Sequence, residues 1–133
     1  MNSIIPVAAP YAAILGLLGA ALTINVIVNR VRSRVDAGDG GIARLAQAIR
    51  AQGNFVEQAP LALIVIAFAE ASGARPLVVQ ILCILLVATR LASAYALNGS
   101  LGQSPLRQFG GGTGVLVLAG ASIVLLFAIA GLR

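Results

Sequence analysis

The chain has 133 residues, of which 59% are hydrophobic and only 10% are charged, and its mean hydropathy is +1.00. A soluble domain is about 25% charged, so this composition excludes a water-soluble globule of this size. The net charge is +5, but no basic patch is interleaved with aromatic side chains, which excludes a nucleic-acid-binding surface. The sequence predicts a single membrane-embedded domain over residues 1–133.

Four apolar segments follow one another, each of about the length that crosses a bilayer. The first, 6–30, has no basic region ahead of it, which predicts a permanent span and not a cleaved signal peptide. The second, 42–72, is longer than a span needs and carries polar residues in its first half. The third, 77–97, is interrupted by Arg90, and the fourth, 107–132, follows a polar linker. The expected fold is an all-α bundle of four transmembrane helices.

The basic residues are unevenly distributed between the two ends of this bundle. Four spans place both termini on one side of the membrane, where Arg75 and Arg133 lie. The two loops on the other side hold five arginines: Arg30, Arg32, Arg34, Arg44 and Arg107. The positive-inside rule therefore predicts cytoplasmic arginine-rich loops and termini outside the cytoplasm.

A polar stripe runs along the first half of the second segment. Its members are three, four and three residues apart and so share one helix face over about 15 Å: Gln47, Arg50, Asn54 and Glu57. Arg50 and Glu57 are too far apart in sequence for a tight intrahelical salt bridge, so each charge is expected to find a partner on another helix. Arg90 and Arg107 are the candidate partners, Arg90 for Glu57 especially.

Two interpretations of this stripe remain open from the residues alone. Polar side chains can orient helices in a bundle or an oligomer, whereas ionisable residues at membrane depth are also functional candidates. With Arg90 and Arg107 nearby, the cleft would suit a small anion that carries carboxylates or a thiolate. The chain has no histidine, the commonest general base and metal ligand, so no metal site is expected.

Two smaller features also give expectations. The run from Gly110 to Gly114 lacks the Gly-Lys-Ser/Thr ending of a phosphate-binding loop, so it predicts close helix packing instead. Glu70, near the end of the second segment, is expected to reach water or to pair with Arg75.

The segment RAQGNFVEQAPL, residues 50–61, resembles the signature of the MAPEG family, the membrane-associated proteins in eicosanoid and glutathione metabolism. In that family an Asn lies four residues after the Arg, a Glu three residues further, and then a Pro. The resemblance extends to chain length, the basic first loop, Arg90, Tyr95 and the sequence SPLR at 104–107. It implies a homotrimer with active sites between subunits that open toward the cytoplasm.

The resemblance also implies glutathione as a co-substrate, with transferase or peroxidase activity on lipophilic electrophiles or hydroperoxides. It assigns the binding of glutathione to six residues: Arg30, Arg50, Asn54, Glu57, Arg90 and Tyr95. It places Arg107 beside the sulfur as the catalytic residue, where a guanidinium favours the nucleophilic thiolate over the thiol.

Two positions depart from the eicosanoid-type members of the family. Gln58 stands where they usually have a Tyr, and Leu91 stands where they often have a second aromatic residue. The sequence is thus more similar to the bacterial branch, which implies the inner membrane with periplasmic termini.

Two other classes of function are compatible with the sequence. Small multidrug exporters also have four spans and one buried Glu, which here would be Glu57, but they normally place that Glu in the first helix. A non-catalytic membrane scaffold would retain the polar stripe for assembly alone.

Overall fold

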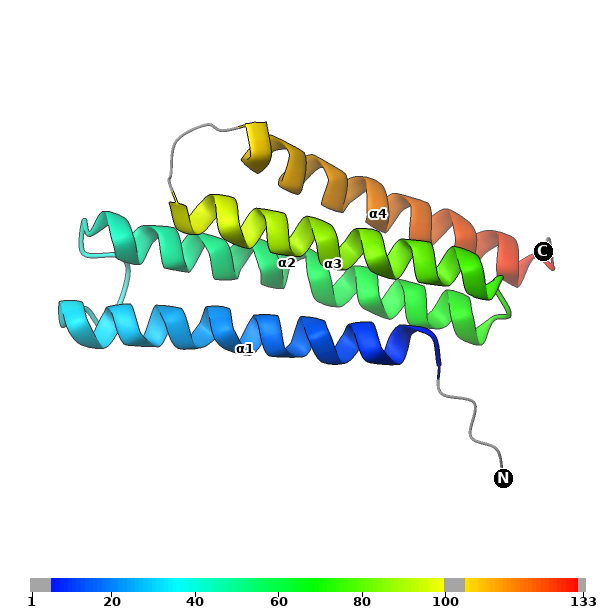
Figure 1. The fold of residues 1–133 in the computed structure, drawn as a ribbon, viewed down its shortest axis with the longest axis horizontal. Helices are drawn as coiled ribbons and strands as arrows, with labels where there is room; N and C mark the ends of the chain where they lie inside the picture. Colours follow the sequence, from blue (N-terminus) through cyan, green and yellow to red (C-terminus); the bar gives the residue numbers. More distant parts are fainter. Residues whose placement is uncertain (1–5, 100–104, 132–133) are drawn as a thin grey trace, which may run out of the picture.

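The structure, a computed structural model, describes the backbone of residues 6–99 and 105–131 and the side chains of residues 6–97 and 112–131. Four helices run alongside one another: α1 (Ala8–Ser33), α2 (Ala43–Ala71), α3 (Pro76–Gly99) and α4 (Pro105–Ile129) (Figure 1). The described part of the chain contains no strand. Each helix includes a stretch that is long and apolar enough to span a membrane. The predicted all-α bundle of four membrane-spanning helices is confirmed.

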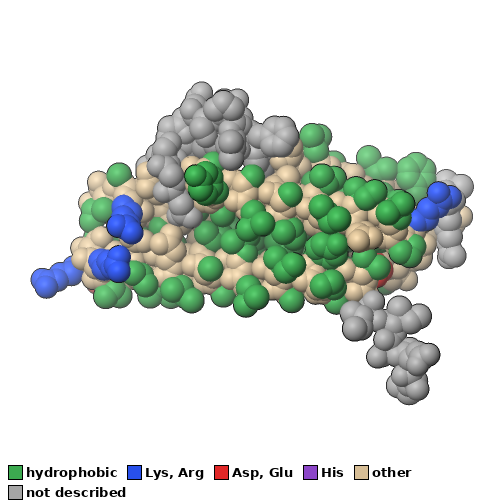
Figure 2. All heavy atoms as spheres, in the orientation of Figure 1, with side chains coloured by type: hydrophobic (Ala, Val, Ile, Leu, Met, Phe, Trp, Pro, Cys, Tyr) green, Lys and Arg blue, Asp and Glu red, His purple; other side chains and the backbone are tan. Residues whose placement is uncertain are grey.

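Helices α2 and α3 form the centre of the bundle. Each contacts both α1 and α4, which lie on opposite sides of this pair (Figure 1). The buried core is narrow and consists mainly of small and medium-sized apolar side chains, among them Ile66, Val79, Cys83, Leu86 and Ala121. Many larger apolar side chains lie on the outside (Figure 2). An apolar exterior around a thin core is the arrangement expected when lipid is the solvent.

One end of the bundle is fastened by Glu70 near the end of α2. Its carboxylate accepts hydrogen bonds from the backbone N–H groups of Val7 and Ala8, the latter at 3.0 Å. These N–H groups have no partner within α1 because they lie at its start, and a negative charge there is favourable to the helix dipole. The expected alternative of an ion pair between Glu70 and Arg75 is not found among the described residues. Glu70 instead ties the start of α1 to the end of α2.

The opposite end is closed by Arg30 near the end of α1. Its Nη1 donates to three carbonyl oxygens of the α1–α2 loop, at 2.9 Å for Gly38, 3.2 Å for Asp36 and 3.5 Å for Val35. Arg34 ends the helix in the left-handed conformation, with φ of 53°. The loop is thus folded back around the guanidinium of Arg30.

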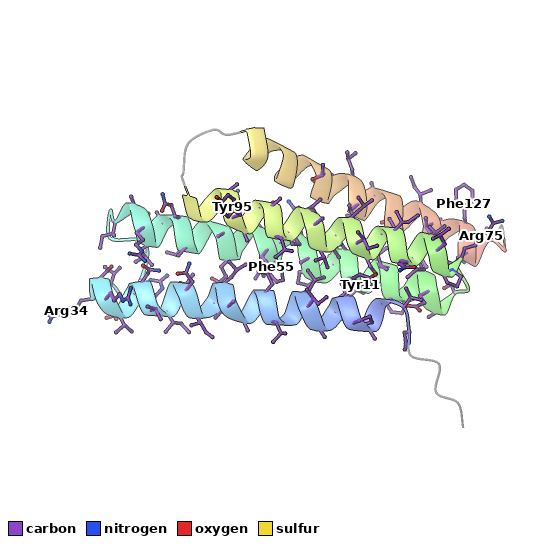
Figure 3. The ribbon with its side chains drawn as sticks, in the orientation of Figure 1. Tyr11, Arg34, Phe55, Arg75, Tyr95 and Phe127 are labelled. Carbon is purple, nitrogen blue, oxygen red and sulfur yellow. The ribbon has the colours of Figure 1, made fainter. Side chains whose placement is uncertain are left out.

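Contacts between α1 and α2 show how deep the polar stripe lies. A β-carbon on Gly19 would stand 2.9 Å from Cε1 of Phe55, so only glycine lets this ring lie against α1 (Figure 3). Nearby, Nε2 of Gln52 donates to Oγ1 of Thr23 at 3.1 Å. Gly19 and Thr23 lie in the middle of α1, within a run that has no charged residue before Arg30. The stripe on α2 therefore extends to the level of the hydrocarbon core.

Candidate binding site on helix α2

The two charged residues of the polar stripe lie on the outer face of α2. Nη1 of Arg50 is 3.6 Å from Oε1 of Glu57, and the side chains are 51% and 58% exposed. The two charges thus contact each other along α2, whereas partners on other helices were expected. The long arginine side chain spans two helical turns and reaches the carboxylate along its own helix.

Asn54, between these two residues in sequence, lies on the side of the stripe that meets the inside of the bundle. It is buried against α3, where Nη1 of Arg90 donates to its Oδ1 at 3.2 Å and to its carbonyl oxygen at 3.5 Å. Arg90 is 1% exposed and is the largest fully buried side chain among the described residues. The expected ion pair between Arg90 and Glu57 does not form; Arg90 contacts Asn54 instead.

Helix α4 closes over this buried polar cluster at Gly114. A β-carbon at Gly114 would lie 2.0 Å from Oε1 of Gln58 and 2.2 Å from Nη2 of Arg90, which no real side chain tolerates. Oε1 of Gln58 is buried and has no hydrogen-bond partner in the described part of the chain. The close helix packing expected of the glycine-rich run is confirmed at Gly114.

Gln58 and Gly114 were not among the candidate site residues. A signal for Gln58 was present, because it lies four residues after Asn54 and so continues the inward face of the same helix. Nothing in the sequence distinguished Gly114 from its neighbouring glycines, since the register between α3 and α4 depends on tertiary packing.

The charged half of the stripe is left uncovered in a single subunit. Arg50 and Glu57 project from α2 at the depth where α1 is apolar, and lipid is a poor solvent for either side chain. Pro60 adds to this polarity because it has no N–H to donate to the carbonyl of Val56. On α3, Tyr95 is 80% exposed (Figure 3). The surface therefore requires a polar ligand, a neighbouring subunit, or both.

The sequence matches a family model and two curated relatives. The model of the MAPEG family matches residues 8–127. The chain belongs to the MAPEG family. Among curated proteins, it is 39% identical over 95 residues to the inner membrane protein YecN of Escherichia coli strain K12, covering 71% of this chain and 72% of the relative. The YecN protein of Escherichia coli O6:H1 strain CFT073 matches with the same values, and no solved structure gives a significant match.

Two other expected site residues of this MAPEG protein are Arg30 and Arg107. The recorded bonds of Arg30 go to loop carbonyls and not to the α2 stripe. Arg107 is in the first turn of α4, but its side chain lies outside the described residues. Within the described ranges, no group of three acidic, cysteine or histidine side chains could hold a metal ion.

Proposed function

We propose that this MAPEG protein is a glutathione-dependent transferase or peroxidase of the inner membrane. It activates the thiol as thiolate for attack on lipophilic electrophiles or hydroperoxides. The observation that carries this proposal is the exposed Arg50–Glu57 pair, at bilayer depth on the helix that carries the motif resembling the family signature.

The charges of the pair complement those of glutathione, which has two carboxylates and one ammonium group. Arg50 can bind a carboxylate through two parallel N–H donors, and Glu57 can accept from the ammonium. At 3.6 Å the two side chains are in ionic contact but not tightly bonded, so each can exchange its partner for the ligand. Arg90 serves this site from inside the subunit by holding Asn54.

Assembly supplies the rest of the site in this proposal. A homotrimer would cover the exposed pair with a neighbouring subunit and bring the exposed Tyr95 of one copy to the stripe of another. By the positive-inside rule, we propose that the arginine-rich α1–α2 loop faces the cytoplasm, and that the opposite end, where α1 begins and α4 ends, faces the periplasm (Figure 1). Glutathione would then enter from the cytoplasm and the lipophilic substrate from the bilayer.

Arg107 is the proposed catalytic residue. A guanidinium close to the sulfur stabilises the thiolate relative to the thiol, and the thiolate is the nucleophile. In conjugation the sulfur forms a thioether with the electrophilic carbon, which either expels its leaving group as an anion or, in an addition to a double bond, passes the electron pair to the neighbouring atom for protonation. In peroxidase turnover two glutathione molecules are oxidised to the disulfide while the hydroperoxide is reduced to an alcohol and water.

The proposal is tested by titrating the purified, detergent-solubilised protein with glutathione while following ultraviolet thiolate absorbance and proton release. We expect stoichiometric thiolate formation, which Arg107→Ala abolishes while glutathione still binds. Arg75→Ala, at the opposite end of the bundle, is the matched control and leaves both signals unchanged. Failure of the wild-type protein to bind millimolar glutathione would contradict the proposal.

A further inference from the structure

We propose that the pocket at the end of α1 binds the phosphate group of an anionic phospholipid. The pocket has a volume of about 480 Å³, and its lining combines basic and apolar side chains: Ile27, Arg30, Val31, Arg34, Val35 and Asp36. It lies where the α1–α2 loop begins, and neither Arg50 nor Glu57 is among its lining residues. The inference does not depend on the proposed enzymatic activity.

The depth of the pocket matches the headgroup region of a bilayer. With 26 residues, α1 is about 39 Å long at roughly 1.5 Å per residue, whereas the hydrocarbon core is about 30 Å thick. If α1 is centred in the membrane, Arg34 lies about 20 Å from the midplane, level with the headgroups. Figure 2 shows basic side chains gathered at this end of the molecule.

The guanidinium group of Arg30 is held in a position from which it can bind an anion. Its Nη1 is held by three loop carbonyls, and its described hydrogen bonds all use this one nitrogen. The N–H groups on Nε and Nη2 of the same planar guanidinium can therefore donate to another acceptor. These two adjacent donors match the spacing of two phosphate oxygens. The guanidinium is positioned before any ligand arrives.

Arg34 supplies the second positive charge. It is exposed at the very end of α1, and Figure 3 shows it directed away from the helices. The described residues contain no ion pair between Asp36 and either arginine of the pocket. Both guanidinium groups thus remain open to an external anion.

The rest of the lining favours a lipid over a free phosphate ion. Ile27 and Val31 are 53% and 73% exposed on the side that faces the bilayer, where an acyl chain can lie along them. The carboxylate of Asp36 also lines the pocket and repels a dianion more strongly than the single charge of a phosphodiester. An amphiphile with one negative charge therefore fits both parts of the pocket.

The test compares lipid retention by native mass spectrometry of the protein in micelles that contain phosphatidylglycerol or phosphatidylcholine with the same acyl chains. We expect phosphatidylglycerol to be retained preferentially, and Arg34→Asn to weaken its binding about fivefold. Asparagine is chosen because it tolerates the left-handed backbone at this position. Arg34→Lys keeps the charge and should retain most of the preference.

Arg75→Asn removes one exposed arginine at the other end of the bundle and is expected to leave the preference unchanged. Equal loss in this control would show a general effect of net charge and overturn the proposal. Equal retention of the two lipids by the wild-type protein would also overturn it. Displacement of the lipid by millimolar inorganic phosphate would identify a free-anion site instead.

Discussion

Nη2 of Arg90 lies 2.2 Å from the point at which a β-carbon on Gly114 would stand. Helix α4 can cross over the buried guanidinium only because it has no side chain at this position. The same opening admits the Gln58 amide oxygen, so one glycine accommodates polar groups from both central helices. A charged residue in the interior of the bundle is thereby enclosed by backbone.

Gly114→Ala should destabilise the protein by about 1–3 kcal/mol, because the added methyl group forces Arg90 and α4 apart. Gly112→Ala is the matched control, since a β-carbon there meets nothing within 4 Å. Thermal unfolding can be followed with a thiol-reactive dye, because Cys83 is the single cysteine and is fully buried. Equal melting temperatures for the two variants would contradict the role assigned to Gly114.

Arg90 and Asn54 should show energetic coupling across α2 and α3. Replacing Arg90 by Met leaves the Asn54 oxygens without this donor, and replacing Asn54 by Leu in the same protein should restore part of the loss. We expect a coupling energy of about 0.5–2 kcal/mol in a double-mutant cycle of unfolding free energies. Gln52→Leu, on the side of α2 that bonds to Thr23, should be additive with Arg90→Met. Additivity in both cycles would show that the Arg90–Asn54 contact contributes nothing.

Most of the fold was predictable from the sequence, but only part of the site was. Apolar segments of bilayer length give the number of helices and their approximate ends, and α1 extends only three residues beyond its predicted end at residue 30. Helical periodicity predicted one polar face for Arg50, Asn54 and Glu57, and this held for the exposed Arg50 and Glu57 but not for the buried Asn54. It did not show that Asn54 turns inward while its two neighbours in the motif turn outward.

The partners of the charged residues depended on tertiary contacts that sequence spacing does not contain. The seven-residue spacing of Arg50 and Glu57 predicted no contact between them, but the long, flexible arginine side chain brings its Nη1 to 3.6 Å from the carboxylate. The sequence suggests water or Arg75, the nearest opposite charge, as the partner of Glu70, whereas its hydrogen bonds go to the start of α1, more than sixty residues away. Such contacts become visible only when the register between helices is known.

Glu57→Gln should separate the proposed enzyme from a proton-coupled exporter. Removing the carboxylate charge is expected to weaken glutathione binding by about tenfold or more, because one charge-assisted hydrogen bond is lost. In vesicles with a pH gradient, neither the wild type nor the variant should move lipophilic cations. Efflux by the wild type that disappears in Glu57→Gln would favour the exporter.

Glu70→Ala should loosen the first turn of α1. The change leaves the N–H groups of Val7 and Ala8 without their acceptor and removes a negative charge from the helix start, at a cost of about 1 kcal/mol. Hydrogen exchange should accelerate at these two amides and not in the centre of the helix. Glu70→Gln keeps one acceptor oxygen and should have a smaller effect. If Arg75→Gln accelerated exchange equally, the cap would not belong to Glu70.

Gly19 and Phe55 offer the sharpest test of the register between α1 and α2. A β-carbon at Gly19 would stand 2.9 Å from Cε1 of the ring, so Gly19→Ala should lower the melting temperature, whereas Gly16→Ala, where a β-carbon meets nothing within 4 Å, should not. Phe55→Leu removes the atom that would clash, and the double variant should therefore be more stable than the sum of the two single effects predicts. Simple additivity would show that α1 lies elsewhere on α2, and the assignment of the polar stripe to bilayer depth would fall with it.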